Sequence, residues 1–239
     1  MKIISYNVWF SNYKMKERLM SLIDTINVQQ PDIVCLQEVV KYQHDELKKI
    51  GYNIYPAELK DEYECVILSK YPIDKFNVIK MPSNMNRKIC FIKVSVNEKD
   101  IVIVNVHFES EFRKTNTIKI MQYKYVSLIV NKLYMDYKNV ILCSDTNVTI
   151  NDTNYFNKYF DEMNDSWEKC GFNKDNQYTY DCETNNNLQS RKIKLRSRID
   201  RIMFRCNDLY VDNFSLLNVN NNIQPSDHHG IVCFFLFTK

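Results

Sequence analysis

Apolar residues recur along the chain with two different periods, which predict an alternation of strands and helices. A first apolar run at 3–8 is followed by leucine and isoleucine at positions 19, 22, 23 and 26. This spacing places them on one face of a helix, so we expect an amphipathic helix at about 14–29 that ends at Pro31. A short apolar run at 33–37 then predicts a buried strand, and the three elements form a β–α–β unit.

Further apolar runs predict the rest of a two-sheet core. Residues 101–107 are mostly β-branched and apolar, which is typical of a central strand. A second helix is expected at about 115–134, and a surface helix at 41–49 would leave His44 exposed to solvent. Other strands are expected at 52–55, 64–69, 74–81, 89–96, 140–144, 198–206 and 230–237. Residues 151–197 are polar and rich in asparagine.

These elements predict a single α/β domain over residues 1–239, in which two sheets pack together. No internal repeat and no linker rich in proline and glycine divides the chain. The sequence starts directly with a strand pattern, shows no signal-peptide pattern, and has no apolar run near the ~20 residues that a membrane span needs. We therefore expect an intracellular monomer, nuclear or cytoplasmic, without a membrane partner.

Composition restricts the chemistry that the chain can perform. Lysine and arginine total 32 and aspartate and glutamate total 29, so the net charge of +3 is too small to indicate nucleic-acid binding by itself. The three glycines exclude the glycine-rich loops that hold phosphates, so phosphate chemistry would need side chains or a metal ion. None of the eight cysteines forms a C-x-x-C pair, and several lie in apolar runs, so we expect buried, reduced thiols.

Polar side chains gather at five points where the predicted buried strands begin or end. All five groups would meet at one edge of the fold if the last strand runs antiparallel to the others, and binding residues commonly gather on such loops. The groups are Asn7; Gln37 and Glu38; His107, Glu109 and Ser110; Ser144, Asp145, Thr146 and Asn147; and Ser226, Asp227, His228 and His229.

Three residues of these groups are candidate metal ligands. Glu38 and Asp227 offer carboxylate oxygens, and Asn7 adds an amide oxygen. Oxygen ligands suit Mg²⁺ or Mn²⁺ and do not suit structural zinc, which prefers sulfur and nitrogen. Taken singly, each of these residues is explained equally well as a turn or capping residue.

Five further residues fit the metal-assisted hydrolysis of a phosphodiester. Asp145 can hold and deprotonate a water molecule, and Asn147 can donate a hydrogen bond to that water or to a phosphoryl oxygen. His107 and His228 can donate to the oxygens of the transition state. Asp200 lies on an apolar strand, where it would need a partner, and pairing with His228 would keep that imidazole oriented and protonated.

The order of these motifs resembles that of the endonuclease/exonuclease/phosphatase superfamily over residues 3 to about 235. The segments that carry the resemblance are Tyr6-Asn7, Leu36-Gln37-Glu38, His107, Asp145-Thr146-Asn147, Arg198-Ile199-Asp200 and Ser226-Asp227-His228. Two further segments, Gln177-Tyr178-Thr179-Tyr180-Asp181 and Asp200-Arg201-Ile202-Met203-Phe204-Arg205, are similar to the tyrosyl-DNA phosphodiesterase branch of that superfamily.

This resemblance implies a four-layer α/β sandwich and a requirement for Mg²⁺, with Mn²⁺ as an alternative. It implies hydrolysis of the 5′-phosphotyrosyl bond that joins DNA, or RNA, to a covalently attached protein such as a trapped type II topoisomerase. The product would be a 5′-phosphate, and the role would be in DNA repair. The metal-ligating, proton-accepting and phosphate-contacting residues would have the roles given above.

Four residues are candidates for contact with the nucleic acid: Tyr180, Ser110, Trp9 and Arg198. An aromatic ring such as Tyr180 can stack on a base or sugar, although packing in the core would explain it as well. Trp9 and Phe10 would form a wall beside the nucleic acid or, alternatively, a hydrophobic staple. Arg198 belongs to a basic stretch that either contacts phosphates or forms a solvated face. The stretch is Arg191, Lys192, Lys194, Arg196, Arg198, Arg201 and Arg205.

Three positions depart from the pattern of this branch and bear on substrate preference. Trp9 takes the place of an acidic residue, Thr149 that of a basic residue and Tyr180 that of a tryptophan. Two alternatives stay open. One is another member of the superfamily, such as an abasic-site endonuclease, a deadenylase or a sphingomyelinase-like phosphodiesterase. The other is a catalytically silent nucleic-acid-binding module on the same fold.

Overall fold

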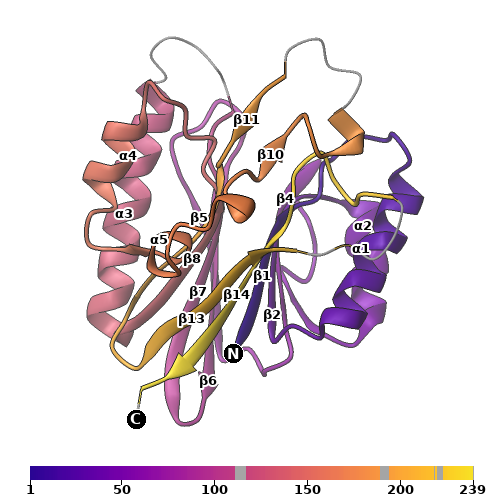
Figure 1. The fold of residues 1–239 in the computed structure, drawn as a ribbon. Helices are drawn as coiled ribbons and strands as arrows, with labels where there is room; N and C mark the ends of the chain where they lie inside the picture. Colours follow the sequence, from indigo (N-terminus) through magenta and orange to yellow (C-terminus); the bar gives the residue numbers. More distant parts are fainter. Residues whose placement is uncertain (111–116, 189–193, 218, 220–222, 239) are drawn as a thin grey trace.

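Two six-stranded mixed β-sheets lie face to face, and helices cover their outer sides (Figure 1). The structure is a computed structural model that describes residues 1–110, 117–188, 194–217, 219 and 223–238. In Figure 1 the helices α1 (Met15–Gln29) and α2 (Lys41–Leu47) flank one sheet, and α3 (Thr117–Tyr137) and α4 (Thr153–Tyr159) flank the other. The predicted α/β sandwich of two packed sheets is therefore confirmed.

The first sheet contains the predicted β–α–β unit. Its strands, in spatial order, are β13 (Leu209–Leu216), β14 (Ile231–Phe237), β1 (Lys2–Asn7), β2 (Ile33–Val40), β4 (Tyr63–Ser69) and β3 (Asn53–Tyr55). β1 and β2 are parallel and α1 connects them, whereas β14 is antiparallel to β1. The segment before β14 therefore lies at the same edge as the carboxyl ends of β1 and β2, as the sequence predicts.

The second sheet brings further site residues to the same edge. Its strands, in spatial order, are β5 (Lys75–Lys80), β6 (Lys88–Val96), β7 (Lys99–His107), β8 (Asn139–Asp145), β12 (Asp200–Cys206) and β9 (Asn164–Asp165). β7 and β8 are parallel, and Asp145 pairs with His107 on one side and with Asp200 on the other. Strand register alone therefore places three of the predicted catalytic residues side by side.

Shorter elements complete the chain. They are α5 (Ser166–Lys169), the two-stranded pair β10 (Tyr180–Asp181) and β11 (Arg196–Ser197), and three 3₁₀ turns at Lys48–Ile50, Lys174–Asn176 and Asn186–Leu188. The sequence pattern did not predict β13, α4 or α5. The second predicted helix is α3, and residues 115–116 of its predicted range lie outside the described residues. Within the described part of the chain, no helix is both long and apolar enough to cross a membrane.

A polar crosslink joins the two sheets close to the edge that carries the site. The Gln37 side chain of β2 donates from Nε2 to Asn105 Oδ1 of β7 at 2.7 Å. Asn105 Nδ2 in turn donates to the carbonyl oxygens of Leu36 and Val66, at 2.9 Å each. Buried amides without partners are costly, so these bonds fix the two sheets relative to each other. The rest of the interface is apolar and includes Ile3, Cys35, Ile103 and Ile141.

Two predictions about single residue types have opposite outcomes. All eight cysteines lie in the described part of the chain and are free thiols; five are buried, as predicted, whereas Cys65, Cys170 and Cys206 are half-buried. The prediction that His44 is exposed is wrong, because its side chain is 1% exposed and its Nε2 lies 2.8 Å from the carbonyl oxygen of Pro56. The chain that follows α2 turns back over the helix, and this long-range contact leaves no local mark in the sequence.

Because His44 is buried, we expect the stability of the folded protein to depend on pH. Burial lowers the pKa of His44 below its ordinary value of 6.5. The unfolded chain therefore binds this proton first as pH falls, so stability should be lost below pH 6.5. In urea unfolding, wild type should lose more stability between about pH 7.5 and about pH 5.5 than His44→Gln, which keeps an N–H donor for Pro56. Equal losses would contradict this role.

Candidate active site

The five polar groups converge on one open cleft at the shared edge of the two sheets. The cleft has a volume of about 720 Å³. Of the residues that the sequence predicts for the site, those that line the cleft are Asn7, Trp9, Glu38, His107, Ser110, Asp145, Asn147, Tyr180, Arg198, Asp227 and His228. Asp200 lies behind them and reaches the site through His228. The predicted convergence of the strand ends is confirmed, and Glu38 and Asp227 lie in the same cleft.

Backbone irregularities aim several of these side chains into the cleft. The β2–β4 register shifts between Leu36 and Val39, and Glu38, at the centre of this bulge, has a φ of 61°. Trp9 and Asn147 also have positive φ, at 57° and 46°. Non-glycine residues in this conformation carry strain that gathers at functional sites, and bulges redirect side chains in the same way. Three such residues on one cleft support a functional site there.

Asp145 is held in one orientation by its neighbours, and burial raises its pKa. Its Oδ2 accepts from Asn7 Nδ2 at 2.9 Å, and its Oδ1 accepts from the backbone N–H of Asn147 at 3.1 Å. Burial, and next the charge of Asp200, raise the pKa of Asp145 to about 7. A carboxylate with a pKa near neutrality is matched to accepting a proton from water.

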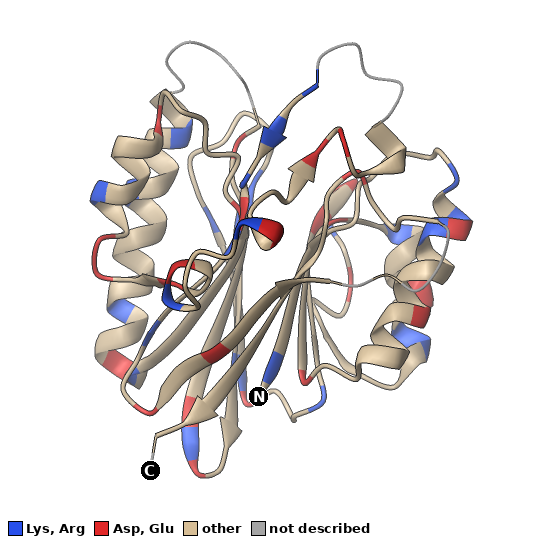
Figure 2. Cartoon of the chain, viewed as in Figure 1, with Lys and Arg blue, Asp and Glu red and all other residues tan. Residues whose placement is uncertain are grey.

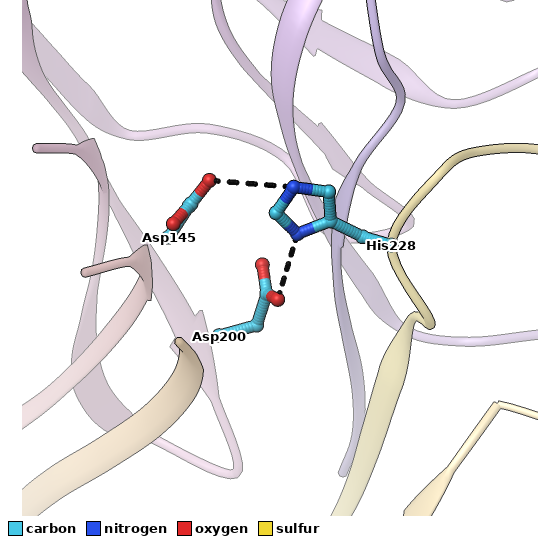
Figure 3. A group of neighbouring side chains, drawn as sticks. All are labelled: Asp145, Asp200 and His228. Carbon is cyan, nitrogen blue, oxygen red and sulfur yellow. Dashed lines mark hydrogen bonds and ion pairs between the residues drawn. The ribbon is translucent and has the colours of Figure 1, made fainter. Parts of the chain in front are cut away.

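His228 is a protonated donor aimed at Asp145. Its Nδ1 lies 2.9 Å from Asp200 Oδ2, and its Nε2 lies 3.9 Å from Asp145 Oδ2 (Figure 3). Burial lowers the pKa of His228, but the charges of Asp200 and Asp145 outweigh burial and hold it well above its ordinary value. Asp200 therefore orients the ring and keeps its Nε2–H available, as the sequence predicts.

His107 is a neutral donor, and an arginine that the sequence did not reveal determines its tautomer. Arg87 donates from an Nη to His107 Nδ1 at 2.8 Å, so the ring hydrogen lies on Nε2, which is 3.3 Å from Asp145 Oδ2. Burial, and next the charge of Arg87, lower the pKa of His107 well below its ordinary value. Arg87 also lies over the ring of Tyr63, 5.2 Å from its centroid, and Tyr63 stacks on Phe10.

Two uncharged residues of the polar segment hold the catalytic loops. Thr179 Oγ1 accepts from the backbone N–H groups of Ile199 and Asp200, at 3.1 and 3.0 Å, and so fixes the start of β12. Asn185 Nδ2 donates to the carbonyl oxygens of Ser226 and His228, at 3.0 and 3.1 Å. The asparagine-rich composition of this segment is thus partly explained, since short amides satisfy backbone groups of the loop that bears Asp227 and His228.

The predicted nucleic-acid contacts lie along the cleft, with one correction. The Tyr180 ring packs edge-on against the His228 imidazole at 5.3 Å, and the Trp9 ring stacks on the guanidinium of Arg18 at 4.6 Å. Arg198 donates to Asp165 at 2.7 Å and keeps its place on the cleft wall. The alternative of a solvated face is wrong for Arg201, because it is buried against the same carboxylate at 3.0 Å.

Of the other members of the basic stretch, Arg196 also lines the cleft and Arg205 does not. Arg205 pairs with Glu162 and lies over the ring of Tyr134, away from the cleft. Arg191 and Lys192 lie outside the described residues. Arg196 pairs with Asp181 at 3.0 Å. Figure 2 shows basic residues interspersed with acidic ones over the fold.

The donor groups of the cleft fit a divalent metal ion. Glu38, Asp145, Asp200 and Asp227 bring four carboxylates together, and burial raises the pKa of Glu38 although His228 and Arg87 oppose this. Such an excess of buried acidic groups is what a divalent cation compensates. Asp145, Asp200 and His228 have ligand atoms within 4.8 Å of one another. Because His228 Nδ1 already faces Asp200 Oδ2, the carboxylates of Glu38 and Asp227 that line the cleft are the better-placed candidates for a metal ion.

Comparisons with known proteins agree with this geometry. A model of the Endonuclease/Exonuclease/phosphatase family matches residues 4–228. The chain belongs to this family. Tyrosyl-DNA phosphodiesterase 2 of Mus musculus is 28% identical over 247 residues, which cover 96% of this chain and 65% of the mouse protein. The chain thus spans about 65% of the length of that relative.

Solved structures of the family share the fold over the whole chain. The D. rerio TDP2 structure complexed with a single-strand DNA product has a TM-score of 0.87, 23% identity and coverage of 99% of this chain and 98% of that one. Truncated Caenorhabditis elegans TDP2 has a TM-score of 0.85 and 23% identity, over 99% of this chain and 97% of that one. At 23% identity these two likenesses show a shared fold.

Proposed function

We propose that the chain is a Mg²⁺-dependent phosphodiesterase, folded as one domain over residues 1–239. Its reaction is hydrolysis of the 5′-phosphotyrosyl bond between DNA, or RNA, and a covalently attached protein such as a trapped type II topoisomerase. The proposal places the protein in DNA repair, as an intracellular monomer. Its main support is the set of catalytic side chains in one cleft of a chain that is 28% identical to a tyrosyl-DNA phosphodiesterase.

In the proposed reaction each residue has a task that its surroundings allow. Asp145 takes a proton from the attacking water, since its carboxylate lines the cleft and is held in place by Asn7 and the backbone of Asn147. The Nε2–H groups of His107 and His228 donate to phosphoryl oxygens, and the Asn147 amide contacts the same group. Glu38, Asp227 and Asn7 would hold the metal ion, which supplies charge stabilisation at the phosphate when bound.

A second, smaller pocket meets the cleft at the reacting centre, and it supports a substrate with two unlike parts. Glu38 and His107 line both cavities. The small pocket adds Tyr63, Met85 and Arg87. The chemistry of these groups suits a phenol, because an aromatic ring, a thioether and a cation offer stacking and stabilise a departing phenolate. The nucleic acid would then follow the larger cleft past Tyr180, Ser110, Trp9 and Arg198.

Oxygen-only ligands favour Mg²⁺, with Mn²⁺ as a substitute. The same ligand set predicts that activity depends on free metal. Treatment with EDTA should abolish turnover, and added Mg²⁺ should restore it. Full activity in EDTA, after dialysis against chelator, would contradict the metal assignment.

A panel of substrates tests the reaction. A 5′-tyrosyl oligonucleotide should be converted to a 5′-phosphate end, whereas a 3′-tyrosyl oligonucleotide, an abasic duplex and poly(A) should not react. Each is incubated with Mg²⁺ and with chelator, and products are resolved by mass spectrometry. Turnover of the abasic duplex or poly(A) instead would point to another activity of the family. No turnover of any substrate would favour a nucleic-acid-binding module.

A further inference from the structure

A buried lysine outside the cleft contacts the loop that carries Asn147. Lys119 lies in the first turn of α3 and its side chain is 1% exposed. Its Nζ lies 2.6 Å from Asp152 Oδ2 and donates to the backbone carbonyl oxygen of Asn147 at 2.6 Å. A buried ammonium group is costly unless it is paired and hydrogen-bonded, so this placement needs an explanation.

The partner of Lys119 closes the same loop from the other side. Asp152 Oδ1 accepts from the backbone N–H of Thr149 at 2.5 Å and from its hydroxyl at 3.1 Å. Asp152 thus links the ammonium of α3 to Thr149, two residues after Asn147. Tyr123, one turn farther along α3, donates its hydroxyl to the carbonyl oxygen of Thr146 at 3.2 Å. The loop at 146–152 is therefore held against α3 at several points.

Asn147 needs this support because its backbone is strained. Its φ is 46°, a region that non-glycine residues enter only when their surroundings impose it. Its N–H donates to Asp145 Oδ1, and its side-chain Nδ2 donates to the carbonyl oxygen of Phe108 at 3.1 Å. The bond from Lys119 fixes the third polar group of Asn147, its carbonyl oxygen. With three of its four polar groups held, the Asn147 side chain stays at the cleft beside Asp145.

We infer that Lys119, through its ion pair with Asp152, is a positioning residue that holds Asn147 in its catalytic conformation. Lys119 does not line the cleft, so it acts without touching the substrate. The effect on turnover rests on the proposed function. Small displacements of a positioned group are known to be costly to catalysis. Loss of the pair should therefore lower kcat and leave KM nearly unchanged.

The test uses the full chain with Mg²⁺ and two substrates, a 5′-tyrosyl oligonucleotide and the generic phosphodiester bis(p-nitrophenyl) phosphate. Lys119→Met should lower kcat about 10- to 100-fold per folded molecule. Lys119→Met alone leaves the Asp152 carboxylate buried without its lysine. The double variant Lys119→Met/Asp152→Asn removes this charge and keeps an acceptor for Thr149. It should fold and show the same loss of kcat. Lys124→Met, an exposed lysine on the same helix, is the matched control.

A second measurement does not depend on activity. Backbone amides of 146–152 should exchange with deuterium faster in the double variant than in wild type or Lys124→Met. Unchanged exchange, or wild-type kcat in the double variant, would overturn the inference. If wild type hydrolyses neither substrate, the proposed function fails, while the exchange measurement still decides whether Lys119 holds the loop.

Discussion

Asp145→Asn is expected to keep substrate binding and to lose about 100-fold or more in kcat, as removal of a general base does. Asp145 lies within hydrogen-bonding distance of Asn7 and Asn147, and both contacts are donated to its carboxylate. An asparagine has the same size but can accept only through one oxygen, and it cannot take a proton from water. Single-turnover rates with a 5′-tyrosyl oligonucleotide, with binding measured separately, would separate the chemical step from affinity.

Asp145→Asn should lower activity but should not lower stability. Because burial raises the pKa of Asp145 to about 7, the folded state binds this proton more tightly than the unfolded chain. The stability that this proton provides is present at acidic pH and is lost as pH rises through about 7. In EDTA at alkaline pH, Asp145→Asn should therefore be at least as stable as wild type. Asp136→Asn, an exposed carboxylate on α3, is the control that should change neither property.

If Asp145→Asn keeps the kcat of wild type, Asp145 is not the general base. A variant that loses activity together with much of its stability would point to a structural role instead. The combination of full folding and lost turnover is the outcome that supports a base, since residues placed for chemistry are often held at a cost to stability.

Most of the fold could be predicted from the periodicity of apolar residues and the order of the strands. The apolar runs of β1, β2, β7 and β8 are buried on both faces, which makes them continuous in sequence and easy to identify. β13 was missed because it is an edge strand that, among the described residues, pairs only with β14, and only Leu209 and Phe214 of its eight residues are buried. Its pattern resembles that of a polar loop.

Some residues of the site could be predicted from sequence motifs, and others could not. Glu38, Asp145 and Asp227 stand in motifs beside buried strands, so their convergence follows from topology. Arg87 contacts His107, and Lys119 contacts Asn147. Neither Arg87 nor Lys119 lies in a motif, so only the packing of distant segments reveals these contacts. His44 was predicted exposed for the same reason, since the chain that covers it comes later in the sequence.

Glu38→Gln is expected to raise the Mg²⁺ concentration needed for half-maximal activity at least about 10-fold, with part of the rate recovered at high Mg²⁺. Glutamine keeps an oxygen that can accept from the N–H of Phe10, which donates to Glu38 at 3.1 Å. It removes only the negative charge that a divalent cation needs. Initial rates measured across a Mg²⁺ titration check this expectation, and Glu62→Gln, an exposed glutamate, is the control.

Metal binding itself can be read without substrate, because a ligand that binds the folded state stabilises it. The melting temperature of wild type should rise with Mg²⁺, and Glu38→Gln should need more Mg²⁺ for the same rise. In chelator, Glu38→Gln should melt at a higher temperature than wild type. Burial raises the pKa of Glu38, so the charge of its carboxylate is costly when no cation is bound. A Mg²⁺ dependence identical to that of wild type would show that Glu38 is not a metal ligand. The divalent ion would then have to be held by Asp227 and Asn7 with the residues around Asp145.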